Sequence, residues 1–118
     1  MHKNDFVEKL YNLVAKDNLE IYKELFSNTD ISEATDPYWK ESLQLYKNLT
    51  DEDKLVFFKV LRQAGIDAVS SILALLDGVT SLEGQDDEFS LTFKKANERL
   101  NGDLQDLFLE FDENSRYS

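Results

Sequence analysis

The sequence predicts a mainly α-helical fold: a compact bundle of about five helices around a buried central helix (51–77), with a short β-hairpin near 89–100. Three observations support this. Apolar side chains recur at three- and four-residue spacing through most of the chain. Residues 55–76 are apolar on more than one face, which is typical of a buried helix. Only residues 89–93 alternate with the period of a strand. The length of 118 residues fits a single helical domain, 1–118.

Three helices are expected in the first half of the chain, over about 4–15, 18–26 and 37–48. Each has apolar side chains at helical spacing, and the first two can also form one continuous helix. Turn-forming residues separate the second helix from the third. Asp36 followed by Pro37 is a typical helix start, because the carboxylate caps the first amides and proline fits the first turn.

The next helix is the expected core of the bundle. Thr50 and the acidic residues after it form a start that resembles a capping box, and Gly78 after Asp77 fits a left-handed cap at the end. Between 55 and 76 only three residues are charged. A glycine inside a helix costs about 1 kcal/mol relative to alanine. Gly65 is therefore expected to serve a close helix contact or a kink.

The pattern changes after residue 88. Residues 89–93 favour a strand, and Arg99 with Leu100 is expected to pair back onto it as a hairpin. The Asn101-Gly102 pair then starts the last helix. That helix carries a clean apolar stripe at helical spacing, formed by Leu104, Leu107, Phe108 and Phe111.

The composition excludes most catalytic chemistry. The chain has no cysteine and one histidine, His2, so disulfides, thiolate metal sites and Cys- or His-based catalysis are not expected. Ser70 and Ser71 lack the glycine-flanked turn of a serine hydrolase, and no phosphate-binding glycine motif occurs. A calcium loop started at Asp77 fails, because Leu82 stands where glycine is required. We therefore expect a protein that is not an enzyme and holds no cofactor or metal.

The net charge of -11 limits the class of partner. Nucleic acids and anionic membrane surfaces attract clustered Lys and Arg, so neither is an expected partner. The most apolar segment, 64–76, is too short and too polar to span a bilayer, which needs about 20 apolar residues. No signal-peptide core follows the first Lys. The expected location is therefore the cytoplasm.

The acidic residues are concentrated in the last third of the chain. Residues 77–118 hold 11 of the 24 acidic residues but only 4 of the 13 basic ones. Such a region either keeps the protein in solution or docks on a basic protein. Tyr38 and Trp39 either seal the core edge or anchor an interface. The candidate partner-binding residues are Asp86, Asp87, Glu88, Asp103, Asp106, Glu110, Tyr38 and Trp39.

Asp67 is the one acidic residue expected to be buried, because it interrupts the apolar central helix. A buried carboxylate must be paired or hydrogen-bonded, and Arg99, Ser70, Ser71 or a backbone amide are candidate partners. The favoured interpretation is a structural group. The alternative is a carboxylate that binds a ligand or takes part in catalysis.

A small, strongly acidic, cysteine-free, mostly helical chain without catalytic groups resembles the acidic helical immunity proteins with which bacteria block nuclease toxins. The resemblance is one of overall character, and this chain is longer than the colicin-type proteins. It implies a domain that binds and inhibits a basic toxin or nuclease through its acidic face. The alternatives are a structural module that forms a homodimer, and a small ligand-binding protein that uses Asp67.

Overall fold

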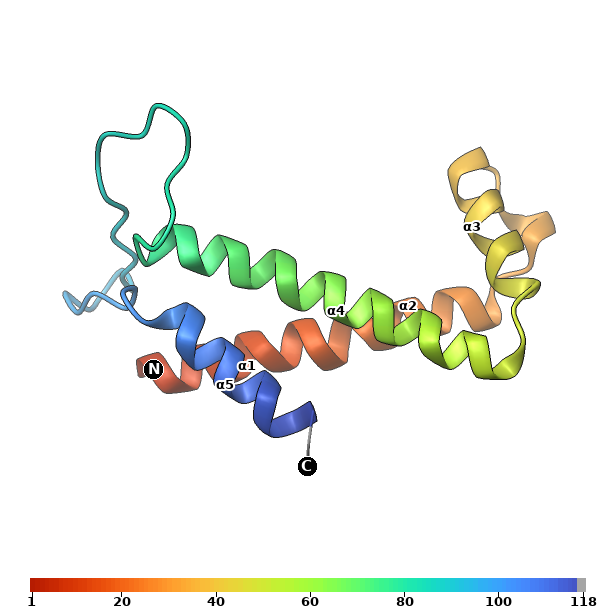
Figure 1. Cartoon of the computed structure of the whole chain (residues 1–118), viewed down its shortest axis with the longest axis horizontal. Helices are drawn as coiled ribbons and strands as arrows, with labels where there is room; N and C mark the ends of the chain where they lie inside the picture. Colours follow the sequence, from red (N-terminus) through yellow and green to blue (C-terminus); the bar gives the residue numbers. More distant parts are fainter. Residues whose placement is uncertain (117–118) are drawn as a thin grey trace.

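The computed structural model describes residues 1–116, and this part of the chain is mainly helical and holds no β-strand. The helices form two long rods, a shorter helix packed near them at one end and another helix at the opposite end (Figure 1). The radius of gyration is 17.8 Å, against about 13.5 Å for a globular chain of this length. The expectation of a compact bundle is therefore wrong, and the molecule is elongated, with extents of 51 × 37 × 26 Å.

The first rod is one continuous helix made of three parts. These are α1 (Lys3–Asn12), a five-residue π-helical turn η1 (Leu13–Asp17) and α2 (Asn18–Asn28). A π-turn inserts one extra residue into a helix without ending it. The two helices expected here are therefore joined, which leaves four helical rods, not five, in the part of the chain that the structure describes.

A short 3-10 turn η2 (Ile31–Glu33) leads to α3 (Pro37–Lys47). The Asp36 carboxylate accepts a hydrogen bond from the Tyr38 amide at 3.0 Å, which confirms the expected helix start. Around buried Phe26, ring centroids lie between 5.1 and 6.4 Å away, in edge-to-face or tilted arrangements that favour aromatic packing. The rings packed against Phe26 are those of Trp39, Tyr46, Phe57 and Phe58.

The second rod is α4 (Asp51–Leu76), and Thr50 caps it by accepting a hydrogen bond from the Asp53 amide at 3.1 Å. Its first half enters the aromatic cluster through Phe58, and its second half enters a separate main core through Ile66 and Leu73. That core also contains residues of α1 and α5, among them Val7, Tyr11, Leu104 and Phe108. The helix is therefore central in the sense that it joins both cores.

Only one side of α4 is buried. The expectation that nearly all faces of this helix are buried is therefore wrong. Leu55, Val56, Val60 and Ile72 are each more than half exposed. The physical reason is the number of neighbours. The first rod and α5 cover one side, and residues 1–116 contain no further helix that covers the other (Figure 1).

The expected close contact at Gly65 is present. A β-carbon placed on Gly65 would lie 3.6 Å from the Val14 side chain in the π-turn, which is an ordinary van der Waals distance. The glycine therefore lies against the first rod, but there is room for a β-carbon at this position, so the contact does not require glycine.

The last rod is α5 (Leu104–Arg116), and its expected apolar stripe is confirmed. Leu104 and Phe108 are fully buried, and Leu107 and Phe111 pack beside them.

The hairpin expected near 89–100 is wrong. Residues 89–93 and 99–100 share one backbone hydrogen bond, from the Leu100 amide to the Leu91 carbonyl at 2.8 Å. An isolated two-stranded ribbon is marginally stable in water. Here the segment is instead held by its apolar side chains, since Leu91 packs on the main core and the Phe93 ring lies 6.2 Å from that of Phe6.

Candidate protein-binding site

The α4–α5 loop, residues 77–103, is the longest part of the described chain without helix or strand. It lies at the end of the molecule opposite α3 (Figure 1). Loops of this length in a folded domain are usually functional or disordered. Hydrogen bonds hold several parts of this loop in place.

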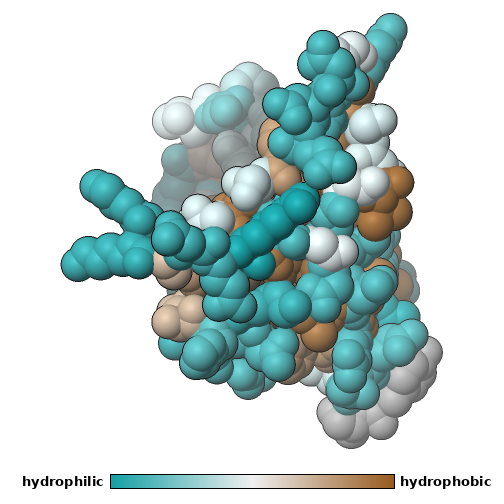
Figure 2. Space-filling model, turned by 90° about the vertical axis from the view of Figure 1, so that its left-hand side faces the viewer, coloured by the Kyte–Doolittle hydropathy of each residue, from teal (hydrophilic) through white to brown (hydrophobic). Residues whose placement is uncertain are grey.

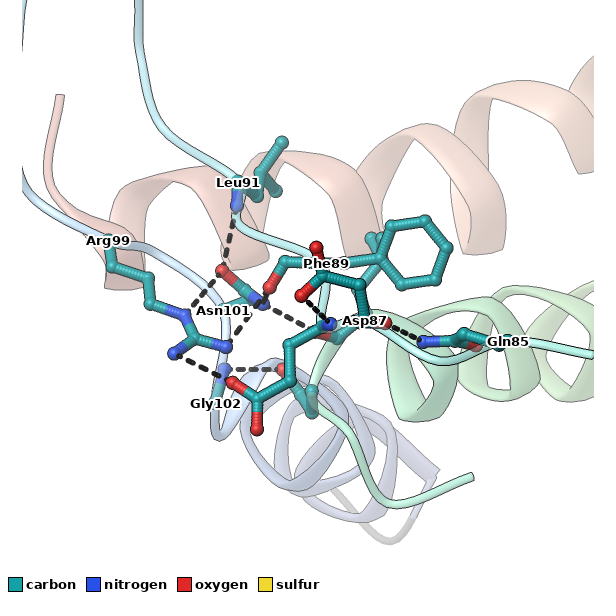
Figure 3. A network of polar contacts seen from close by, with 10 residues as sticks. Gln85, Asp87, Phe89, Leu91, Arg99, Asn101 and Gly102 are labelled. Atoms are coloured by element: carbon teal, nitrogen blue, oxygen red, sulfur yellow. Dashed lines mark hydrogen bonds and ion pairs between the residues drawn. The ribbon is translucent and has the colours of Figure 1, made fainter. Parts of the chain in front are cut away.

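Asn101 is the main anchor of the loop, and its side chain is buried. Its amide nitrogen donates to the carbonyl of Leu76 at the end of α4 and to the Phe89 carbonyl at 2.9 Å. Its side-chain oxygen accepts from the Leu91 amide at 2.8 Å and from the Arg99 guanidinium at 3.2 Å. Figure 3 shows these bonds meeting at the Asn101 amide. One side chain thus ties together the end of α4 and both halves of the loop.

Arg99 adds a second set of bonds on the outer side of the anchor. Its guanidinium donates to the Phe89 carbonyl at 3.0 Å and lies 3.9 Å from the Glu88 carboxylate. Both side chains of this ion pair are largely exposed, so the pair contributes little to stability. The Glu88 carboxylate thus lies beside Arg99.

The acidic stretch is also shaped by local bonds. The Gln85 side chain accepts from the Leu82 amide at 3.0 Å and donates to the Asp87 carbonyl at 2.7 Å. The Asp87 carboxylate accepts from the Glu88 amide at 2.8 Å (Figure 3). Asp86, Asp87 and Glu88 are therefore exposed on an ordered turn.

Two glycines allow the chain to enter and leave the loop. Gly78 has a φ of 81° and Gly102 a φ of 143°. Residues that carry a β-carbon rarely adopt such positive φ angles, whereas glycine does so readily. The left-handed cap expected at Gly78 is confirmed. Between these two residues the surface is hollowed by a shallow pocket of about 390 Å³, whose lining includes Asp77, Gln85, Glu88, Arg99 and Asn101.

The predicted acidic residues fall into two groups. Asp86, Asp87 and Glu88 on the loop and Asp106 and Glu110 on α5 are exposed, and we call these five residues the acidic end. Figure 2 shows this side of the molecule as mostly hydrophilic, with smaller hydrophobic patches between.

Asp103 differs from the acidic end because its cationic partner lies on another helix and is closer than the 3.9 Å that separates Glu88 from Arg99. Its carboxylate lies 2.9 Å from the Lys3 ammonium in α1, so part of its charge is compensated. It serves to join the loop to the first rod.

Tyr38 and Trp39 are not brought to the acidic end, since α3 lies at the other end of α4 (Figure 1). Trp39 packs on Phe26 and is part of the aromatic cluster, whereas Tyr38 is 69% exposed. The structure therefore does not join the aromatic and acidic candidates into one surface.

The expectation that Asp67 is buried is wrong. Asp67 lies on the open side of α4, where its carboxylate accepts a hydrogen bond from Gln63 at 2.8 Å. Several apolar residues near Asp67 in the sequence also lie on this open side. The apolar composition of the helix therefore does not show that Asp67 is buried.

The buried carboxylate is Asp112, which is 2% exposed in α5. Arg62 of α4 lies 2.5 Å from one of its oxygens and Arg116 lies 2.6 Å from the other. The Tyr11 hydroxyl donates to Asp112 at 3.2 Å and accepts from Arg62 at 2.6 Å. Burial, the largest single influence, raises the pKa of Asp112, but the hydrogen bonds and charges of Arg62 and Arg116 together hold it below its usual value.

A spacing signal for Asp112 was present in the sequence. Leu104, Phe108 and Asp112 are four residues apart, so a carboxylate falls on the apolar stripe of α5 and needs a cation. For Asn101 no comparable signal existed, because an Asn-Gly pair is most often a turn.

Two further properties of residues 1–116 bear on the class of site. None of the helices there combines the length and apolar character needed to cross a membrane. Nor do three His, Asp or Glu side chains gather in that part of the chain as they would around a metal ion.

Comparisons with known proteins give no family for this chain. No protein-family model, no curated protein and no solved structure matches it.

Proposed function

We propose that this chain is a non-enzymatic protein-binding domain whose acidic end docks on a basic surface of a partner protein. The observation that carries the proposal is the anchoring of the α4–α5 loop by Asn101. A loop that is ordered before binding loses little conformational entropy when the partner arrives. Its exposed carboxylates can therefore meet a fixed pattern of cations.

Electrostatics support the same class of partner. A net charge of -11 steers a basic protein toward this chain and repels acidic ones. Such steering mainly raises the association rate and depends on ionic strength. The resemblance to immunity proteins suggests that the partner is a basic nuclease or another basic toxin. The loop would inhibit this partner by covering its active surface.

The test begins with affinity capture from the organism's own lysate and identification of the retained proteins by mass spectrometry. Binding of the captured protein is then compared between the native chain and a triple variant, Asp86→Lys, Asp106→Lys and Glu110→Lys. These side chains are exposed, so the fold is expected to persist. The proposal predicts a basic partner whose association with the triple variant is at least about tenfold slower at low salt.

A matched control separates a local site from net charge alone. Asp17→Lys, Glu24→Lys and Glu41→Lys change the charge by the same amount at exposed positions on the first rod and α3. The proposal predicts near-native association for this control. Equal slowing by both variants, or a captured partner that is not basic, would contradict it.

A further inference from the structure

The side chain that anchors the α4–α5 loop belongs to a chemically labile pair. Asn101 and Gly102 form the only Asn-Gly pair in the sequence. In such a pair the backbone nitrogen of the glycine can attack the asparagine side chain and displace ammonia, a reaction called deamidation. Glycine favours this attack, because it has no β-carbon to hinder it. In an unfolded chain, Asn101 is therefore the asparagine most susceptible to deamidation.

The backbone of the loop requires this glycine. Gly102 has a φ of 143°, which a residue with a β-carbon would adopt only with strain. A larger residue after Asn101 would slow deamidation, but it would distort the turn that leads into α5. The susceptibility of Asn101 is thus tied to the geometry that lets it anchor the loop.

In the closed loop both reacting groups are held by other bonds. The attacking group is the Gly102 nitrogen, whose N–H donates to the Asp77 carboxylate at 2.6 Å. The leaving group is the side-chain nitrogen of Asn101, which donates to the carbonyls of Leu76 and Phe89 (Figure 3). The Asn101 side chain is also buried, at 6% exposed. Deamidation therefore requires these bonds to break, which means that the loop must open.

Asp77 protects the Gly102 nitrogen and does not activate it. The nitrogen must lose its proton before it attacks, which leaves a negative charge on it. A carboxylate at hydrogen-bond distance disfavours that charge, because like charges repel. Carboxylates are also much weaker bases than amide anions, so transfer of the proton to Asp77 is unfavourable.

We propose that Asn101 is a deamidation site that the closed loop protects, and that its conversion releases the loop permanently. When the loop opens, the Gly102 nitrogen loses its proton to water and forms a bond to Cγ of Asn101. The bond from Cγ to the side-chain nitrogen then breaks, and that nitrogen takes up a proton and leaves as ammonia. Water opens the resulting cyclic imide to aspartate or isoaspartate. One water is consumed, one ammonia is released, and no group is oxidised or reduced.

The product cannot restore the anchor. An ionised carboxylate has only acceptor oxygens, so at position 101 it cannot donate to the carbonyls of Leu76 and Phe89. Isoaspartate also adds a carbon to the backbone before Gly102 and shifts its amide relative to Asp77. Because the ammonia diffuses away, the amide is not formed again. The loop thus carries a one-way release that needs no partner, so it stands whether or not the acidic end binds one.

The first experiment compares the folded chain with the same chain in guanidinium chloride, both incubated at neutral pH. Peptide mapping by mass spectrometry measures aspartate and isoaspartate at each asparagine. We expect Asn101 to convert faster than the other asparagines in the denatured chain, and at least about tenfold more slowly in the folded chain. Equal rates at Asn101 in the two samples would overturn the proposal.

Two variants separate opening of the loop from unfolding of the whole chain. Asp77→Ala removes the acceptor of the Gly102 amide and is expected to speed conversion of Asn101 about tenfold in the folded chain. Asp112→Asn is the control, because it weakens the main core without removing a bond of the loop. It is expected to leave the conversion rate nearly unchanged. Equal rates in both variants would contradict control by the loop.

A third variant tests the release. Asn101→Asp carries the carboxylate of the product and is expected to raise the hydrogen-exchange rate of the Gly102 amide about tenfold or more. Asn97→Asp is the matched control, because it adds the same charge at an exposed position of the same loop. Its Gly102 amide is expected to exchange at the native rate. Native exchange at Gly102 in Asn101→Asp would show that conversion does not release the loop.

Discussion

Asp77, the residue that follows α4, caps the start of α5. One of its carboxylate oxygens accepts a hydrogen bond from the Gln105 amide at 2.8 Å, and the other accepts from the Gly102 amide at 2.6 Å. A helix is usually capped by the residue directly before it. Here the cap comes from the other end of a long loop, so forming α5 also closes that loop.

Replacing Asp77 by Ala is expected to lower the free energy of unfolding by about 1–2 kcal/mol, as for the loss of a strong helix cap. Asp77→Asn keeps one acceptor oxygen and is expected to cost less. Chemical denaturation monitored by circular dichroism measures both. Equal stability of the native chain and Asp77→Ala would show that the cap is not important.

Asp112→Asn is expected to lower the free energy of unfolding by about 2–3 kcal/mol. Breaking a fully buried ion pair costs 3–5 kcal/mol, and the cost is smaller here because the Arg62 and Arg116 side chains are 22% and 42% exposed. Urea denaturation at pH 7 measures the loss.

The same residue predicts a pH dependence. Because the pKa of Asp112 is lower in the folded chain than its usual value of 3.8, its ionised form stabilises the fold above about pH 4. This contribution is lost as the pH falls from about 4 through the lower folded pKa. Asp112→Asn should therefore show a weaker loss of stability over that range than the native chain. Parallel pH profiles would contradict the assigned pKa direction.

Asn101→Ala is expected to release the α4–α5 loop and to lower the free energy of unfolding by about 2 kcal/mol, since it removes the Asn101 donor from the Leu76 carbonyl and the acceptor from the Leu91 amide. The Leu91 amide, which donates to Asn101, should then exchange its hydrogen faster. Asn97→Ala is a matched control, because Asn97 is exposed in the same loop. Unchanged exchange at Leu91 would mean that other contacts hold the loop.

Gly65→Ala is expected to stabilise the protein by about 0.5–1 kcal/mol. The new methyl group meets Val14 at an ordinary contact distance, and alanine is the better helix former. Thermal unfolding measures the change. Loss of stability would show that α4 and the π-turn are packed more tightly than this distance implies.

Local signals predicted the helix boundaries well. Asp36 and Thr50 each cap the helix that follows them, because capping depends on a few neighbouring residues. The apolar stripe of α5 was equally clear. These features require no knowledge of the rest of the chain.

The errors all involve contacts between distant residues. Burial of α4 depends on how many helices surround it, and its composition cannot distinguish a core helix from one with an apolar face available to a partner. The hairpin prediction was wrong for a similar reason. The Leu91 amide donates its hydrogen bond to the Asn101 side chain and not to the backbone of a neighbouring strand. Asp112 is buried where Asp67 was expected to be, because only the fold decides which carboxylate meets Arg62.

The α4–α5 loop is expected to be a fixed surface, because Asn101 and Asp77 hold it. Amide hydrogen exchange on the native chain tests it most directly, at the amides of Leu91, Gly102 and Gln105, which donate to those side chains. All three amides are expected to exchange much more slowly than in an unfolded peptide of the same sequence. Exchange at the unfolded rate, with the helices still protected, would contradict it.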